Sequence, residues 1–415
     1  MSATNWGGNY AYRAQQIHAP SSVEELQEIV SSSRRVRVLG ARHSFTAIAD
    51  AAELVTLDGI RPHIVIDSDA MTVSFGGALR YGELAMELER HGLALSNLGS
   101  LPHLAVAGAI STATHGSGDR NGNLATAVAA LEIVTGDGEV FRTSRGEPDF
   151  DGMVVGLGAV GALTRITLDV EPTYQVRQRV FDRLSWDALF EHFDAIMSSG
   201  HSVSVFTRWG PTTEQVWVKR RDDEGPDFDP PELFGAVAAT AERHPIPGLD
   251  PANSTPQLGV PGPWYDRLPH FRMGFMPSSG AEIQSEYLFA RRFAVPAIEA
   301  VRRLSPTIQP LTQISEIRTV AADTLWMSPE YGQDTVGIHF TWQLEQAAVE
   351  RALAEVERAL APFDARPHWG KLFLGPPKGV GRSYERFDHF ASLLERLDPA
   401  GVFRNEWLER KVFGR

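Results

Sequence analysis

The stretch RVRVLGARHSF, residues 35–45, constrains the fold more than any other segment of this chain. A short apolar strand at 36–39 runs into a turn opened by Gly40, and His43 and Ser44 follow at once. Junctions of this kind bring backbone N–H groups together as a nest for anions, and small residues let a phosphate approach closely. Many turns contain a glycine, so this segment indicates a phosphate site only together with a second one.

A second loop of small and hydroxyl-bearing residues follows in the same part of the chain. Residues 100–103 (SLPH) lead into 106–108 (VAG), and the run TATHGSG occupies 112–118. Two such loops near the N-terminus suit a long cofactor that carries a diphosphate in its middle.

Composition excludes several classes of function. The net charge of −13 argues against nucleic acid or an anionic membrane as a partner, because both need a basic surface. Without cysteine the chain cannot form disulfides, thiolate metal sites or a cysteinyl flavin link. The first residues are polar and no apolar run reaches the length of a membrane span, so we expect a cytoplasmic protein. The oligomeric state stays open, and a monomer is compatible with the sequence.

Short helices and strands without a regular βαβ rhythm predict an α+β fold. In the first part we expect helices at 22–30 and 79–90, and strands at 36–39, 54–57, 71–75 and 163–170. The segments 131–135 and 139–143 flank Gly136-Asp137-Gly138 and predict a hairpin.

The length predicts more than one domain. We place a cofactor domain at 1–172, a substrate domain at 173–375, and a C-terminal segment at 376–415 whose helix, 387–397, returns to the first domain. In the second domain we expect a helical face at 186–197 and a strand from 202. Residues 226–263 hold nine prolines and predict a long ordered loop.

Three later stretches, 312–319, 335–343 and 368–373, predict strands. Alternate side chains of a strand point to opposite faces. One face of 335–343 is apolar, and the other carries His339 and Thr341. In the other two strands we expect shared faces for Thr312, Ile314, Glu316 and Arg318, and for Trp369, Lys371 and Phe373.

Taken together, these motifs resemble those of the vanillyl-alcohol-oxidase-type FAD oxidoreductases, and among them the alditol (xylitol) oxidases and aldonolactone-oxidising enzymes. The resemblance covers nearly the whole chain and rests on GARHS at 40–44, SLPH at 100–103, THGSG at 114–118, EIR at 316–318, HFTW at 339–342, PHWGK at 367–371 and DPAG at 398–401. It implies a two-domain, PCMH-type FAD-binding fold with an α/β substrate (cap) domain.

One position departs from the family pattern. The first loop usually reads Gly-x-Gly-His-Ser, and here Arg42 replaces the second glycine. Two alternatives follow: a negative φ at Arg42 with its guanidinium near phosphate or solvent, or a rebuilt turn.

The resemblance implies FAD linked through its 8α position to His43, although a lone loop histidine usually only forms hydrogen bonds. It also implies a cofactor site formed by Gly40, Ala41, Arg42, His43, Ser44, Phe45, Ser100, Ala105, Gly108, Thr112, Ala113, Thr114, His115, Leu163 and His368. No spacing suggests a metal site.

For the substrate, the resemblance implies contacts from Ser100, Glu316, Arg318, His339, Thr341 and Lys371, with Glu316, Arg318 and Lys371 as catalytic residues. Acceptors, donors and groups that do both suit a polyol, whose hydroxyls do both as well. The polar strand faces could instead be solvated outer faces of a sheet. We favour a substrate floor, because a flavin domain needs a second domain to hold the substrate.

Three functions remain in view. We expect an oxidase that converts the terminal primary alcohol of an alditol to an aldehyde and reduces O2 to H2O2. Gly99 precedes Ser100 and, having no side chain, would leave O2 a path to the flavin; alternatively it serves only the turn. A lactone oxidoreductase is the alternative enzyme, and a non-catalytic carbohydrate-binding protein is the alternative outside enzymes.

Overall fold

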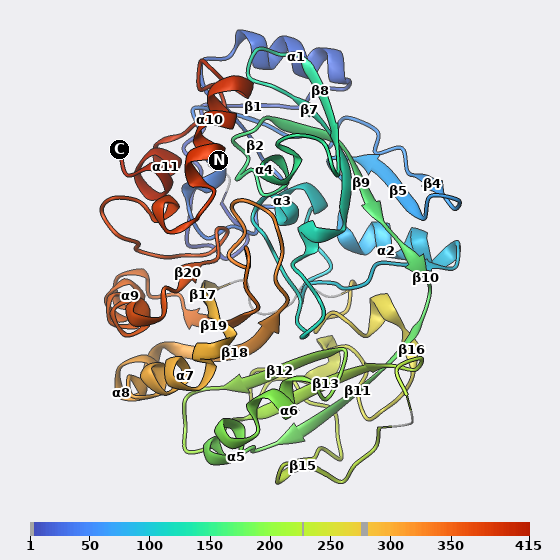
Figure 1. Cartoon of the computed structure of the whole chain (residues 1–415), viewed down its shortest axis with the longest axis vertical. Helices are drawn as coiled ribbons and strands as arrows, with labels where there is room; N and C mark the ends of the chain where they lie inside the picture. The colour runs from blue at the N-terminus through green and yellow to red at the C-terminus, as the bar shows by residue number, and fades with distance from the viewer. Residues whose placement is uncertain (1–3, 226–227, 275–280) are drawn as a thin grey trace.

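The computed structural model describes residues 4–225, 228–274 and 281–415. The first three residues of the predicted cofactor domain and the first two of the predicted proline-rich loop lie outside this range. The chain builds two parts, one above the other in Figure 1, with the C-terminal helices beside the upper part.

The upper part contains two small sheets. A parallel sheet has the order β1-β3-β2, and an antiparallel sheet has the order β4-β5-β9-β7-β8. A short ribbon joins β6 to β10. The strands are β1 (Gln16–His18), β2 (Val36–Val38), β3 (Glu53–Val55), β4 (Val65–Asp67), β5 (Thr72–Gly76), β6 (Leu93–Ala94), β7 (Val128–Val134), β8 (Val140–Ser144), β9 (Ala162–Asp169) and β10 (Glu171–Pro172).

Local sequence explains these elements. Helix α1 (Val23–Ser32) begins where the Ser22 hydroxyl accepts a hydrogen bond from Glu25 N, and it buries Leu26 and Val30. The predicted hairpin joins β7 to β8, and Gly138 sits in its turn with a φ of +84°. Three further α-helices lie in the described residues of this part: α2 (Tyr81–Arg90), α3 (Val106–Ser111) and α4 (Phe150–Val154).

The lower part is one large antiparallel sheet in the order β14-β15-β11-β13-β12-β18-β19-β17-β20, with β16 paired to β11. The chain enters it between β10 and β11. Its strands are β11 (Gln175–Asp182), β12 (Ser202–Thr207), β13 (Gln215–Arg221), β14 (Glu232–Leu233), β15 (Ala236–Ala238), β16 (Gly262–Pro263), β17 (Glu282–Ala290), β18 (Thr312–Val320), β19 (Thr335–Gln343) and β20 (Arg366–Pro367).

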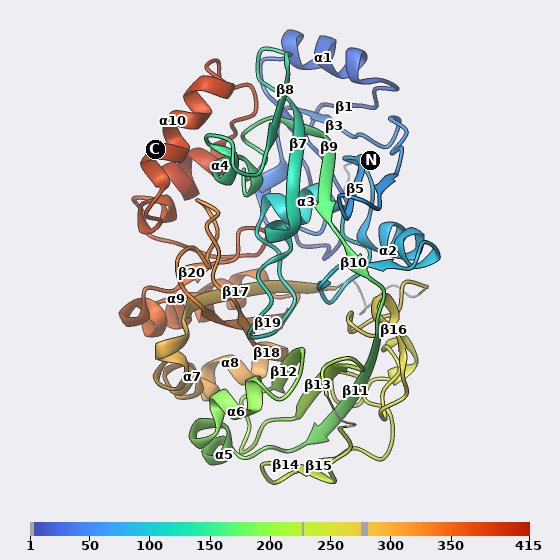
Figure 2. The same cartoon turned by 45° about the vertical axis from the view of Figure 1, so that its right-hand side comes forward.

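Helices accompany this sheet, and α7 (Ala294–Arg302), α8 (Ser305–Ile308) and α9 (Gln346–Leu360) lie beside β17–β19 in Figures 1 and 2. The predicted 186–197 helix is two helices, α5 (Trp186–Glu191) and α6 (Phe193–Met197), which meet at His192. Phe340 of β19 stacks on Trp342 and on Trp209, which in turn stacks on Trp186 of α5. The apolar face of β19 is thus turned toward the helices, and its polar face is left for the site.

The C-terminal segment packs against the upper part. Helix α10 (Phe387–Leu397) contacts α4, Gly136 N donates to Leu397 O at 3.0 Å, and Val36 N donates to Val402 O at 2.9 Å. The short helix α11 (Glu406–Leu408) follows. No described helix is both long and apolar enough to span a bilayer.

Two details of the sequence prediction are wrong. Residues 368–373 form a turn rather than a strand, because Lys371 N bonds back to His368 O. In β18 the register shifts between Thr312 and Ile314, so Thr312 pairs with Trp342 while Ile314 pairs with Thr341. This bulge reverses the alternation, and Thr312 does not share the face of Glu316.

Candidate active site

A single cavity of about 450 Å³ lies between the loops of the upper part and the polar face of the large sheet. Every residue predicted to contact cofactor or substrate lines it, except Ala113. Ala113 is fully buried with a φ of +51°, so its side chain packs in the core and only its backbone could meet a cofactor. Gly99 is buried just outside the lining; a Cβ there would meet His115 O and Leu104 Cδ1 at 3.8 Å.

The first loop is tied down on both sides. Trp6 N donates to Arg42 O at 2.8 Å, and Phe45 N donates to Gly370 O at 2.9 Å. Arg42 has a φ of +60°, so the alternative with a negative φ is wrong. The arginine adopts the left-handed conformation in which glycine is favoured, at a cost of roughly 1–2 kcal/mol.

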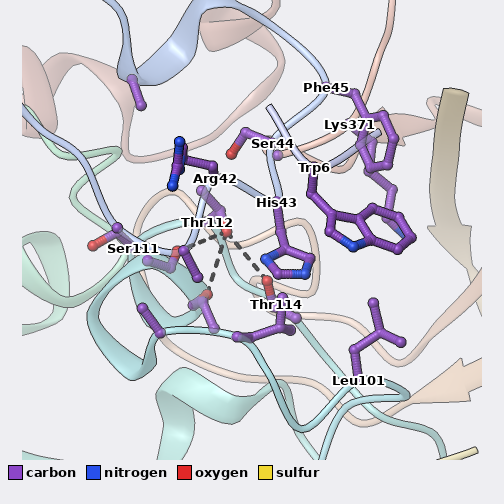
Figure 3. Close-up of a pocket in the computed structure, with 18 of the residues that line it drawn as sticks. Trp6, Arg42, His43, Ser44, Phe45, Leu101, Ser111, Thr112, Thr114 and Lys371 are labelled. Atoms are coloured by element: carbon purple, nitrogen blue, oxygen red, sulfur yellow. Dashed lines mark hydrogen bonds between the residues drawn. The ribbon is translucent and has the colours of Figure 1, made fainter. Parts of the chain in front are cut away.

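His43 points into the cavity beside Trp6 (Figure 3). The two rings stack with centroids 5.3 Å apart and planes 19° apart. Both ring nitrogens are buried and have no hydrogen-bond partner in the described chain. Burial lowers the pKa of His43 to about 4, so the imidazole is neutral at physiological pH.

The second loop offers small groups to the same cavity. Thr112 Oγ1 donates to Gly108 O at 3.0 Å and lies 3.2 Å from Thr114 Oγ1, as Figure 3 shows. A Cβ added to Gly108 would meet no atom within 4 Å, so this glycine borders open space. The two loops therefore frame a cradle that a long cofactor could fill.

The large sheet contributes a polar floor, by which we mean Glu286, Glu316, Arg318, His339, Thr341 and Lys371. Its order follows from the strand register. His339 of β19 pairs with Glu316 of β18 on one side and with Glu286 of β17 on the other. Two residues along β19, on the same face, Thr341 pairs with Ile314 and Gln284. Lys371 reaches the floor from the turn after β20. All of these side chains are largely buried, so the interpretation as a solvated outer face is wrong.

Glu286 is the centre of the floor, and it was not among the residues predicted from the sequence. Its Oε1 accepts from Arg318 Nη2 and its Oε2 from Lys371 Nζ, both at 2.6 Å, and His115 Nε2 lies 3.3 Å away. Burial alone would raise the pKa of Glu286, but the charges of Arg318 and Lys371 hold it well below the usual range. The sequence does carry a pattern that could have predicted it: polar and other residues alternate here, so Glu282, Gln284 and Glu286 share one face of β17.

Glu316 contacts His270, a second residue that was not predicted from the sequence. His270 Nε2 lies 2.9 Å from Glu316 Oε1, and Arg318 Nε lies 3.6 Å from Glu316 Oε2. Burial opposes ionisation, yet Arg318 and His270 together lower the pKa of Glu316 well below its ordinary value. Since His270 belongs to an irregular segment, no periodic pattern could have marked it.

Burial lowers the pKa values of both Lys371 and His339. Burial lowers the pKa of Lys371, and the nearby Glu286 opposes that shift. Burial holds the pKa of His339 well below its usual value, so its ring is neutral. Gln284 Nε2 donates to Glu282 at 2.6 Å, which turns Gln284 Oε1 toward His339 Nε2 at 3.2 Å. His339 Nε2 is therefore the donor, and its Nδ1 is an acceptor.

His115, Glu286 and His368 could hold a metal ion by distance alone, since their ligand atoms lie within 4.8 Å of one another. However, both oxygens of Glu286 already accept short hydrogen bonds from cations. His368 Nδ1 accepts from Gly370 N at 3.1 Å. We therefore interpret His115 and His368 as neighbours of the polar floor at Glu286 rather than as metal ligands.

Comparison with known proteins identifies the family. Residues 14–144 match an FAD binding domain, and residues 294–411 match a family described as D-arabinono-1,4-lactone oxidase. The chain is 46% identical to an alditol oxidase from a Streptomyces species, over 99% of both chains. It belongs to the alditol oxidase family of vanillyl-alcohol-oxidase-type flavoproteins. An L-gulono-1,4-lactone dehydrogenase from Mycobacterium tuberculosis is 28% identical over 99% of both chains.

Solved structures agree on the fold. Cholesterol oxidase from Brevibacterium sterolicum superposes with a TM-score of 0.78 at 14% identity, covering 99% of this chain and 96% of the other. A solvent-stable cholesterol oxidase gives 0.79 at 15% identity, covering 100% and 97%. The predicted fold class, the FAD cofactor and the oxidoreductase class are thus confirmed for this alditol oxidase family member.

Proposed function

We propose that this protein is an FAD-dependent oxidase that converts the terminal primary alcohol of an alditol, such as xylitol or sorbitol, to the aldehyde. The alcohol loses two electrons and two protons, and O2 takes them up as H2O2. The observation that carries the proposal is that the FAD-type loops and the polar floor line one continuous cavity. The identity to a Streptomyces alditol oxidase supports the same substrate class.

The cavity fits FAD by two features. Among the residues that the structure describes, the two buried nitrogens of His43 have no hydrogen-bond partner and Gly108 borders open space. The bound flavin would accept a hydride from the alcohol carbon, and the residues that would hold FAD are 40–45, Ser100, Ala105, Gly108, 112–115, Leu163 and His368.

We further propose that His43 binds the flavin covalently. A neutral imidazole can use a ring nitrogen as a nucleophile, and the low pKa of His43 keeps the ring neutral. In the bond-forming step an N–C bond to the 8α carbon replaces one C–H bond of the flavin methyl group, and the imidazole N–H is lost. The two electrons and two protons released go to O2, the oxidant that the proposed activity already uses.

The polar floor suits a chain of hydroxyls. Lys371 Nζ has three N–H groups and, among the described residues, donates only to Glu286, so two remain for the substrate. Arg318 Nε is likewise buried without a hydrogen-bond partner in the described chain. These donors would stabilise negative charge on the reacting oxygen while its carbon loses hydride. Glu316 would accept from the neighbouring hydroxyl, and Ser100, Thr341 and His339 can bond others.

Gly99 is proposed to keep the approach of O2 open, as the residue directly before Ser100. Its φ is not positive, and a Cβ there would make only ordinary contacts, so the fold does not demand glycine at this position. A role in oxygen access is therefore testable with larger side chains in a protein that still folds.

Oxidation of an aldonolactone is the second candidate, favoured by the match of residues 294–411. Oxygen consumption with xylitol, sorbitol and L-gulono-1,4-lactone separates the two. We expect kcat/KM to be highest for an alditol, with one H2O2 formed for each O2 consumed. A higher kcat/KM for the lactone would favour aldonolactone oxidation over alditol oxidation. A colourless protein that oxidises none of the three compounds would contradict both proposals.

A further inference from the structure

Lys219 of strand β13 lies behind the polar floor, and it is only 1% exposed. Its ammonium group has three N–H donors and three acceptors: Leu268 O at 2.5 Å, Pro269 O at 3.0 Å and His270 Nδ1 at 3.2 Å. Burial lowers the pKa of Lys219 to about 7, so on the acid side of neutrality the group is an ammonium ion, which has no lone pair and can only donate. In that form His270 Nδ1 accepts from Lys219, and the ionised Glu316 on the other side of the ring likewise requires the ring proton to be on Nε2.

The other side of the His270 ring faces the substrate cavity. With its proton on Nε2, His270 donates to Glu316 Oε1 across 2.9 Å. Phe206 and Trp217 meet the ring edge to face, with centroids 5.4 and 5.3 Å away, so the ring has little room to turn. Burial lowers the pKa of His270 to about 4, which keeps the ring neutral with a single N–H.

The backbone of His270 reaches a second substrate residue. Its N–H donates to Ser100 O at 3.1 Å, and its carbonyl accepts from Thr255 N at 2.9 Å. His270 thus contacts Ser100 in the upper part of the molecule and Glu316 in the large sheet. These two residues are predicted to bind substrate hydroxyls from opposite walls of one cavity.

We propose that Lys219 and His270 are positioning residues for the substrate. Lys219 at Nδ1 and the Glu316 carboxylate at Nε2 together favour the Nε2–H tautomer of His270, and His270 then holds that carboxylate as an acceptor at a set distance from Ser100. One hydroxyl of the alditol, next to the carbon that is oxidised, is placed by this pair. The proposal rests on the proposed alditol site, because it assigns Glu316 a substrate hydroxyl.

The tautomer can be measured directly. In holoenzyme labelled with ¹⁵N in histidine rings, we expect His270 to show a protonated Nε2 and an unprotonated Nδ1. The Lys219→Met variant removes the donor to Nδ1, so the share of the Nδ1–H tautomer should rise, although the Glu316 carboxylate still accepts from Nε2 and limits that rise. A protonated Nδ1 in the unaltered protein would overturn the proposal.

Kinetics test the consequence for the substrate. In anaerobic stopped-flow reduction by xylitol, His270→Phe keeps a ring without the donor, and we expect the Kd for xylitol to rise about tenfold, the size of one charge-assisted hydrogen bond. His270→Gln can still donate from its amide and should recover most of the affinity. Lys219→Met should resemble His270→Phe, and Lys411→Met, which alters a lysine bonded to Leu374 O, is the matched control.

The outcomes are separable from failure of the proposed function. Suppose that xylitol reduces the unaltered enzyme, and that His270→Phe and Lys219→Met have the same Kd for xylitol as the unaltered enzyme. The positioning role is then wrong, and the alditol function stands. If no alditol reduces the unaltered enzyme, the function itself is wrong. Should His270→Phe lose its FAD, Lys219→Met and the ring spectrum of the unaltered protein still decide.

Discussion

Replacing Glu286 by glutamine keeps the shape of the side chain but removes the carboxylate that Arg318 and Lys371 share. Both cations donate to it at 2.6 Å, and the Glu286 side chain itself is fully buried. A glutamine oxygen can accept from one cation, while its NH2 group would face the other donor to donor. Removing one partner of a buried ion pair typically costs about 3–5 kcal/mol of folding free energy.

The larger consequence concerns the charge of Lys371. Burial already lowers the pKa of Lys371, and Glu286 is what opposes that shift. Without the carboxylate the pKa falls further, so the ammonium form is lost at a lower pH than in the unaltered enzyme. Loss of a charged donor to a developing oxyanion slows the chemical step by about 10²–10³. We expect Glu286→Gln to slow flavin reduction by xylitol by this factor, with partial recovery as the pH is lowered.

The assay is anaerobic stopped-flow reduction over a range of pH, with flavin content and melting temperature recorded for each variant. Asp119→Asn is the matched control, because it breaks an arginine–carboxylate pair, with Arg291 at 2.6 Å, outside the cavity. A flavin-loaded Glu286→Gln variant with the rate and pH profile of the unaltered enzyme would refute this account of Lys371.

Four further predictions can be tested, three at residues of the site or next to it and one at Asp323 outside the cavity. His43→Ala should bind FAD only noncovalently, so that acid precipitation leaves a white pellet where the unaltered protein gives a yellow one. Lys371→Met and Glu316→Gln should keep their FAD but reduce it about 10²–10³ more slowly with xylitol; near-normal rates would remove both from the chemistry. Gly99→Val should leave reduction by xylitol largely intact and slow reoxidation by O2, and unchanged oxygen reactivity would make Gly99 structural. Burial and the neighbouring Glu330 raise the pKa of Asp323, so the folded protein binds this proton more tightly than the unfolded chain. Stability should therefore fall as pH rises above the ordinary carboxyl value toward neutrality, and chemical unfolding of Asp323→Asn should show a flatter pH dependence.

Regular strands could be predicted well from sequence alone. The alternation in β19 placed His339 and Thr341 on one face because no bulge interrupts that strand. In β18 the same rule failed at Thr312, where one extra residue shifts the register. Lys371 was assigned to the site for a wrong structural reason, since a turn, and not a strand, carries it there.

The remaining site residues depend on tertiary structure. Glu286 stands on a strand whose alternation was visible, but its importance arises only when β17 pairs with β19 and brings it between Arg318 and Lys371. His270 lies in a segment without periodicity. At Arg42 the tertiary structure overrides a local preference, because the backbone keeps a left-handed conformation that its side chain disfavours. A single sequence shows local patterns only. The contacts of Glu286 and His270 depend instead on segments that are far apart in the sequence and meet in the fold.

The central claim is that one cavity holds FAD and an alditol against each other. Anaerobic titration of the purified protein with xylitol tests it most directly. The account predicts a yellow protein whose visible absorption bleaches on addition of xylitol, and on admission of air returns with one H2O2 and one aldehyde formed for each flavin. A yellow protein whose spectrum does not change with xylitol, sorbitol or any other alditol would contradict it.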